Sequence, residues 1–269
     1  MNIKKVQQLI PILFLITTLS NSGYSQELGL NLPMMPWHSQ RDSFAEFAGW
    51  LSMLTASLAK MAQDIILLAQ NEVGEVVESG EPDRGGSSSM PQKRNPIVSE
   101  LVIAAARTNA SLLSAMHHAL IQEHERGTHG WQVEWLTFSQ MVVLTGGALK
   151  NALFLAENLK VNEDVMRKNL ARSNDFVLAE AAVQALSAEI SRTEAQALVK
   201  QACGIAAAEG RSLIEVVRLQ FGETAPHNKI DWETLAKPEN YLGQTRYFID
   251  RVLKQVKRIK PVDPVRSKG

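Results

Sequence analysis

Residues 85–96 read Gly-Gly-Ser-Ser-Ser-Met-Pro-Gln-Lys-Arg-Asn-Pro and separate two long stretches of helical sequence. The glycines permit backbone conformations that are closed to other residues. Asn95 is a favourable N-cap, and Pro96 suits the first position of the helix that follows. Unpaired N–H groups at such a helix start attract anions, and Lys93 adds a positive charge. The segment therefore suits a carboxylate or phosphate ligand, although a solvated Gly/Ser linker has the same composition.

Three long helices are predicted around this segment. Residues 44–71 contain no proline, one glycine and apolar side chains at helical spacing, with Asp42 or Ser43 as the cap. Similar patterns predict helices over about 96–123 and 131–158. Helices of this length exceed the average for globular proteins and are typical of bundles.

From Val161 onward, the sequence pattern predicts shorter helices. No strand-like alternation and no internal repeat is evident, so the expected fold class is all-α. We expect a partial bundle of long helices over residues 27–160, followed by a small helical domain over residues 161–262.

Local signals predict the helix ends of this second part. Thr193 with Gln196 fits a capping box, and Ser212 with Glu215 fits another. Gly210 and Gly222 are expected to end helices. Asn162 is expected to cap a helix over 163–170, and further helices are expected over 176–189 and 244–258.

Residues 1–26 differ from the rest of the chain. Lys4 and Lys5 precede an apolar run, and small polar residues follow it, which is the order of a secretory signal peptide. The run is too short for a membrane span. We therefore exclude this leader from the fold, while a chance apolar stretch has the same composition.

Composition excludes several classes of function. The chain has 28 basic and 28 acidic residues, which does not favour a nucleic-acid-binding surface. Cys203 is the only cysteine, so it forms no internal disulfide, and its apolar helical surroundings predict a buried, inert thiol. The sequence contains no CxxC pair and no HExxH, so no metal site is expected.

Residues 86–96 fit every fixed position of Gly-Ser-Ser-x-Met-Pro-x-Lys-x-Asn-Pro and resemble the substrate-binding loop of the fumarase/aspartase superfamily. The resemblance implies an all-helical lyase or cycloisomerase. It makes Ser87 the general base that removes the proton alpha to a carboxylate. Ser88, Lys93 and Asn95 would bind the substrate and stabilise the aci-carboxylate. A serine alkoxide needs donors and positive charge around it, which this composition supplies.

A second segment, residues 122–135, is dense in titratable and aromatic groups at a break between helices. Arg126 could clamp a carboxylate, and His124, His129 and Glu134 are candidate acid/base or supporting groups. A solvated charge cluster with tryptophans in the core is the alternative. The pattern Glu-Arg-x-x-His-Gly-x-x-x-Glu-Trp resembles the 3-carboxy-cis,cis-muconate cycloisomerase branch, whereas adenylosuccinate lyases have a Glu-Arg-Asp-Leu-Ser-like version.

The third segment, residues 36–42, is a polar cluster that precedes the first long helix. Its Trp-His-x-Gln-Arg-Asp pattern also resembles the cycloisomerase branch. Gln40 and Arg41 are candidate substrate-binding residues, since arginine clamps carboxylates well. Helix capping and subunit packing are the alternatives.

The resemblance runs from about Leu28 to Ile259. Members of the family are longer and form homotetramers whose active sites take segments from three subunits. Their N-terminal carboxylate-binding segments have no counterpart here, so we expect a truncated relative with weak or no activity. A site that lacks several members loses orientation and transition-state stabilisation together.

The implied reaction is a reversible lactonisation of a small polycarboxylate in protocatechuate breakdown, without metal or organic cofactor. The implied assembly is a homo-oligomer in the cytoplasm, without nucleic acid and without a membrane once the leader is removed; the leader leaves export open. Two alternatives are a fumarate-releasing enzyme similar to adenylosuccinate lyase and a helical assembly fragment without catalysis.

Overall fold

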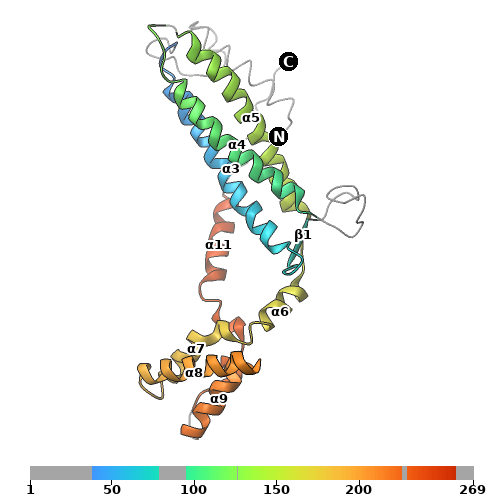
Figure 1. Cartoon of the computed structure of the whole chain (residues 1–269), viewed down its shortest axis with the longest axis vertical. Coiled ribbons are helices and arrows are strands. Elements are labelled where there is room, and N and C mark those ends of the chain that lie inside the picture. The colour runs from blue at the N-terminus through green and yellow to red at the C-terminus, as the bar shows by residue number, and fades with distance from the viewer. Residues whose placement is uncertain (1–37, 79–94, 126, 226–228, 259–269) are drawn as a thin grey trace. The chain divides into compact units, whose positions relative to one another are not determined.

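The computed structural model describes residues 38–78, 95–125, 127–225 and 229–258 (Figure 1). The chain divides into two compact units, Met1–Val165 and Met166–Gly269. Their described residues form helices and two strands of three residues each. The predicted all-α class is therefore confirmed.

Three long helices build the first unit, as predicted (Figure 1). They are α3 (Asp42–Leu68), α4 (Ile97–His118) and α5 (His129–Asn158), and each packs against the other two. Interleaved apolar side chains fill the space between them, because each helix carries apolar residues at a spacing of three or four. One core cluster consists of Ala48, Leu51, Met116, Phe138 and Met141.

Helix α3 is long and apolar enough to cross a membrane by length and composition. A core helix of a bundle has the same two properties. In the structure, α3 packs along α4 and α5 and buries Ala48, Leu51 and Ala62.

A layer of polar side chains crosses the interior of the bundle. Thr55 and Thr145 donate to backbone carbonyls one turn earlier in their own helices, at 3.0 and 2.7 Å. The Asn109 Nδ2 atom donates to Thr145 Oγ1 at 2.9 Å and to Thr55 Oγ1 at 3.4 Å. One residue from each helix takes part, so this layer fixes the register of the three helices.

Two short strands were not predicted. Strands β1 (Val76–Glu78) and β2 (Leu159–Val161) pair antiparallel, with Glu78 opposite Leu159. Three residues are too few to produce a visible alternation of apolar and polar side chains. The ladder ties the segment after α3 to the C-terminal end of α5.

The predicted caps of the first two helices are wrong. Arg41 occupies the N-cap position of α3, while Asp42 and Ser43 lie inside the helix. Pro96, and not Asn95, occupies the N-cap position of α4, and neither helix has a cap hydrogen bond from its own N-cap side chain. At the start of α4, a group distant in sequence takes over, as described below.

The second unit is a small helical assembly with its own core. Leu186, Leu213, Val217 and Phe221 are almost fully buried in it. Its elements are α6 (Glu163–Ala171, which begins in the first unit), η1 (Phe176–Leu178), α7 (Ala179–Leu186), α8 (Arg192–Glu209), α9 (Leu213–Thr224), α10 (Trp232–Leu235), η2 (Pro238–Tyr241) and α11 (Thr245–Val256).

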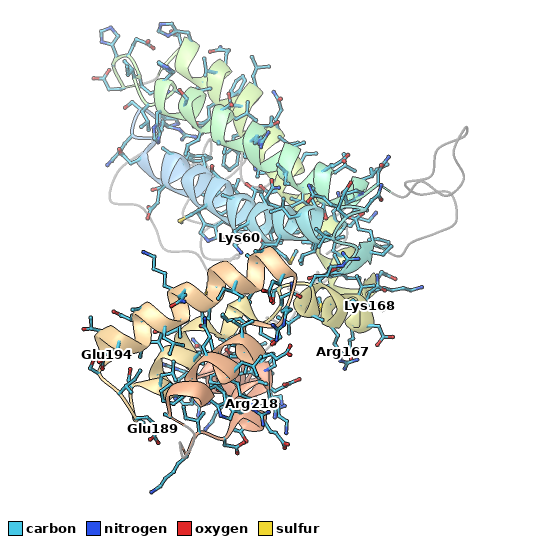
Figure 2. All side chains as sticks on the ribbon, turned by 60° about the horizontal axis from the view of Figure 1, so that its bottom comes forward. Lys60, Arg167, Lys168, Glu189, Glu194 and Arg218 are labelled. Carbon is cyan, nitrogen blue, oxygen red and sulfur yellow. The ribbon has the colours of Figure 1, made fainter. Side chains whose placement is uncertain are left out.

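The capping box of α8 lies two residues before the predicted one. Ser191 accepts a hydrogen bond from the Glu194 backbone, and the Glu194 carboxylate accepts one from the Ser191 backbone. Figure 2 shows Glu194 and Glu189 at the turn between α7 and α8. Thr193 with Gln196 fits the same sequence pattern but lies inside the helix, so that prediction was wrong.

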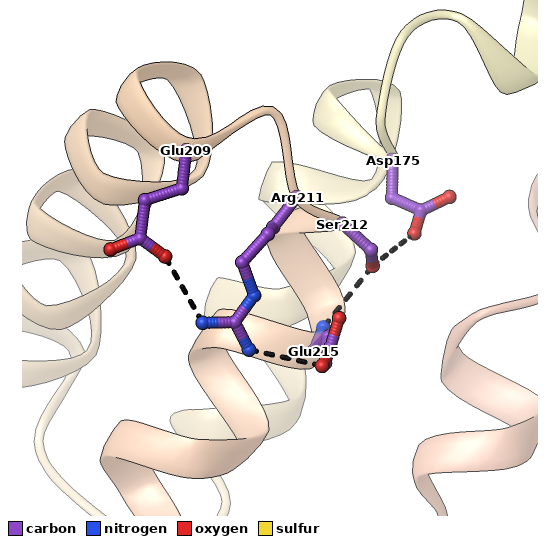
Figure 3. A network of polar contacts seen from close by, with 5 residues as sticks. All are labelled: Asp175, Glu209, Arg211, Ser212 and Glu215. Carbon is purple, nitrogen blue, oxygen red and sulfur yellow. Dashed lines mark hydrogen bonds and ion pairs between the residues drawn. The ribbon is translucent and has the colours of Figure 1, made fainter.

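The start of α9 follows the sequence more closely. Ser212 accepts from the Glu215 backbone at 3.2 Å, as predicted, and donates to Asp175 at 2.5 Å (Figure 3). Arg211 joins this network through Glu215 and Glu209 (Figure 3).

One of the two predicted glycine stops is correct. Gly210 ends α8 with a φ of 63°, a left-handed conformation that glycine adopts readily. Gly222 lies inside α9, so the stop predicted there was wrong.

Candidate functional site

Several predicted site residues lie outside the described part of the chain: Ser87, Ser88, Lys93 and Arg126. The predicted leader, residues 1–26, lies outside it too. Asn95 is described and is half-buried directly before α4, where its carbonyl accepts the Ile97 N–H at 2.9 Å.

Arg41 and Glu134 form a buried ion pair between segments 93 residues apart. Arg41 Nε donates to Glu134 Oε2 at 2.8 Å, and Nη2 donates to Oε1 at 2.5 Å. Both side chains are at most 5% exposed. The guanidinium also lies over the Phe44 ring, 3.9 Å from its centroid. Two parallel hydrogen bonds fix the orientation of both groups, as is typical of arginine with a carboxylate.

A second contact runs alongside this ion pair. The Trp131 Nε1 atom donates to the His38 carbonyl at 2.9 Å, and the two rings lie 5.9 Å apart. The segment before α3 is therefore held to the first turns of α5. Gln40 is exposed between these two attachments. The structure thus brings together two of the three segments that the sequence singled out.

The turn between α4 and α5 is organised by a residue that the sequence analysis did not single out. Glu123 accepts from the Thr128 backbone at 3.0 Å, and its Oε1 lies 2.6 Å from Nδ1 of His129, which makes an ion pair when that imidazole is protonated. The Thr128 backbone hydrogen bond, with the His129 charge assisting, lowers the pKa of Glu123 below its ordinary value. The His129 ring is 78% exposed, and His124 is exposed with a φ of 50°.

Two glycines, Gly127 in this turn and Gly130 in the first turn of α5, pack closely against the side chain of Gln122. A Cβ on Gly127 would lie 1.6 Å from Gln122 Oε1, and a Cβ on Gly130 would lie 2.5 Å from Gln122 Nε2. Gln122 itself donates to the Ala119 carbonyl at 2.5 Å. The Gln122 side chain therefore fills the inside of the turn, and a side chain at either glycine would have to displace its amide group.

Asn95 lies far from this cluster within the same bundle. It precedes the N-terminus of α4, while Glu123, His129 and Glu134 follow its C-terminus (Figure 1). The 22 residues of α4 span about 33 Å at about 1.5 Å per residue. One bundle therefore places the candidate residues in two groups, one at each end.

Among the described residues outside these groups, we looked for a metal-binding cluster and for a reactive cysteine. These residues contain no group of three or more His, Cys, Asp or Glu side chains placed to hold a metal ion. Cys203 is half-buried beside the core of the second unit, and burial raises the pKa of its thiol. A raised pKa disfavours the reactive thiolate.

Comparison with known proteins gives consistent matches. A family described as "Lyase" matches residues 22–109. The chain is 42% identical over 232 residues to a 3-carboxy-cis,cis-muconate cycloisomerase of Pseudomonas aeruginosa, covering 86% of this chain and 50% of that protein. It is 38% identical over 234 residues to trans-aconitate decarboxylase 1 of Mycosarcoma maydis, covering 87% of this chain and 48% of that protein.

The fold comparison agrees. The crystal structure of 3-carboxy-cis,cis-muconate lactonizing enzyme from Pseudomonas putida matches with a TM-score of 0.79 and 40% identity, covering 87% of this chain and 52% of that one. The chain spans about half the length of the curated relatives it matches. Over most of its length, the chain is therefore similar in sequence and fold to about half of a 3-carboxy-cis,cis-muconate cycloisomerase, and residues 22–109 match the lyase family.

Proposed function

We propose that this chain supplies the central and C-terminal parts of a cycloisomerase acting on a small polycarboxylate, with 3-carboxy-cis,cis-muconate as the first substrate to test. One observation carries the proposal. Residues 86–96, the signature loop, keep every fixed position of the pattern Gly-Ser-Ser-x-Met-Pro-x-Lys-x-Asn-Pro. The chain that carries this loop is 42% identical to a curated cycloisomerase. The implied setting is aromatic-compound breakdown in the cytoplasm.

The chemistry is an isomerisation, so it needs no net oxidant and no leaving group. In the lactonising direction, a substrate carboxylate oxygen adds to one carbon of a double bond. A proton is added to the neighbouring carbon, which is alpha to another carboxylate. In the reverse direction, Ser87 as the base removes this proton and the C–O bond breaks. Lys93 and Asn95 would stabilise the negative charge that develops on the carboxylate.

Arg41 and Glu134 fit a supporting role in this scheme. Both Nε and Nη2 of Arg41 donate to Glu134, which favours a holding function for the pair over direct contact with substrate. The exposed Gln40 next to Arg41 is then the better candidate for contact with substrate. His124 and His129 are exposed at the turn that leads into α5, and they remain candidates for proton transfer.

We further propose that the site forms between copies of the chain. Asn95 and the group containing Gln40 lie at opposite ends of α4, so a second bundle running the other way would bring the two groups together. Exposed apolar residues on the bundle helices support association, since such surfaces mark interaction sites. They include Trp50, Met53, Leu101, Leu136, Val143 and Leu153.

Turnover decides between the enzyme proposals. The purified chain and its Ser87→Ala variant are assayed with 3-carboxy-cis,cis-muconate and, separately, with adenylosuccinate. The expected activity is weak, so even slow loss of the conjugated diene absorbance with the unmodified chain supports the proposal if Ser87→Ala shows none above background. Fumarate release from adenylosuccinate would favour the lyase reading instead.

Mass and processing decide the remaining alternatives. Light scattering on the chain alone should give a homo-oligomer, and a monomer would contradict the shared site. An oligomer without turnover of either substrate would favour a helical assembly fragment. N-terminal sequencing of the protein recovered from cells tests the cytoplasmic location, because export would remove residues near position 26.

A further inference from the structure

The start of α4 is satisfied by a carboxylate of the same chain. Glu78, the last residue of β1, accepts from the Val98 backbone at 3.1 Å and from the Ser99 backbone at 2.9 Å. The hydroxyl of Ser99, which is fully buried, donates to the same carboxylate at 2.5 Å. Glu78 therefore reaches across 20 residues to act as the cap that Asn95 was expected to be.

Every backbone donor at this helix start can be accounted for. Pro96 has no N–H, and the Ile97 N–H donates to the Asn95 carbonyl at 2.9 Å. The Val98 and Ser99 N–H groups, which have no acceptor within the helix, donate to Glu78. The Glu100 N–H closes the first helical hydrogen bond to Pro96 at 3.0 Å. No donor of this turn is left for an external anion.

The position of Glu78 is itself fixed by the β ladder. Its backbone pairs with Leu159 of β2, directly after the end of α5. The carboxylate thus connects the end of α5 to the start of α4. Asn95 lies two residues before the first residue of α4, and its carbonyl accepts the Ile97 N–H.

We propose that Glu78 is a positioning residue: it occupies the anion site at the N-terminus of α4 and thereby fixes Asn95 relative to β1. The consequence for substrate rests on the proposed function, because Asn95 is there a substrate-binding residue. It follows that a substrate carboxylate is held by side chains and not by the N–H groups of α4. This differs from the simplest expectation for a glycine-rich loop that leads into a helix.

Hydrogen exchange and chemical rescue test the proposal on the full chain. In Glu78→Ala, the Val98 and Ser99 amides should exchange about tenfold faster or more, as hydrogen bonds to a charged group are lost. Formate fits the vacated anion site, so adding formate should restore their protection in Glu78→Ala, while chloride at equal ionic strength should not. Glu78→Gln keeps the shape and one acceptor oxygen, so it should be intermediate and guards against misfolding of the alanine variant. Glu72→Gln, on an exposed neighbour, is the matched control.

Unchanged exchange of Val98 and Ser99 in both Glu78 variants would overturn the assignment of the cap. If the Val98 and Ser99 amides exchange faster in Glu78→Ala and formate does not slow them, the claim that Glu78 occupies an anion site is overturned. With substrate, Glu78→Ala should lower kcat/KM at least tenfold, with Glu78→Gln in between and Glu72→Gln unchanged. Equal kcat/KM in all four proteins would overturn the link to Asn95. If the parent shows no turnover, the proposed function fails, while the exchange and formate results still decide the role of Glu78.

Discussion

Replacing Glu134 by Gln while keeping Arg41 leaves a guanidinium charge in a site that is only 5% exposed. Breaking a buried ion pair by removing one partner costs about 3–5 kcal/mol, because the remaining charge stays desolvated. Glutamine keeps one acceptor oxygen, so the change removes the negative charge and one of the two hydrogen bonds from Arg41. At about 2–4 °C per kcal/mol for a chain of this size, we expect Tm to fall by roughly 6–20 °C.

Thermal and urea unfolding followed by far-UV circular dichroism measure this effect. The double variant Arg41→Met/Glu134→Leu removes both charges and should recover most of the loss, because apolar replacements of a buried pair are often neutral. Lys60→Ala is the surface control, since its partner Asp64 is exposed and such pairs contribute about 0–1 kcal/mol. Glu134→Gln as stable as the parent would refute the reasoning, as would a double variant less stable than Glu134→Gln.

Three further predictions concern local packing and caps. Gly127→Ala should destabilise the chain by about 1–3 kcal/mol through overpacking against Gln122, and Gln122→Ala in the same chain should restore stability if this clash is the cause. Ser191→Ala should cost about 0.5–2 kcal/mol and Thr193→Ala clearly less, because only Ser191 caps α8; equal effects in urea unfolding would contradict this. The Ser191 hydroxyl and backbone lower the pKa of Glu194, so its contribution is present at neutral pH and is lost as the pH falls through that lowered value. In Glu194→Gln, the free energy of unfolding should therefore change less as the pH falls below neutral. An unchanged dependence on pH would count against a stabilising role of the Ser191–Glu194 capping box.

The long helices could be predicted because their signal is local and repeated. Residues 44–71 carry many apolar positions at one spacing, and tertiary packing reinforces that pattern. The caps were harder. Ser191 and Thr193 both fit the same four-residue pattern, and only the packing of α8 on its neighbours selects between them.

The site could be predicted only in part, for a similar reason. The sequence marked Arg41 and Glu134 as notable, but an arginine that clamps a ligand and one that pairs with a buried glutamate have the same local sequence. The two residues lie 93 positions apart, so their pairing depends on the packing of α3 against α5. Glu78 was missed for the same reason, since its role depends on a ladder of three residues and a helix start 20 positions away.

The central claim, that residues at both ends of the bundle complete one site between copies, is tested most directly by complementation. Ser87→Ala and Gln40→Ala, each expected to be inactive alone, are co-expressed and purified together. If a site takes the signature loop from one copy and the Gln40 segment from another, some sites in the mixture carry both native residues. Turnover of 3-carboxy-cis,cis-muconate should then return to at least a tenth of the parent rate. An active parent with a mixture as inactive as either variant alone would contradict the account.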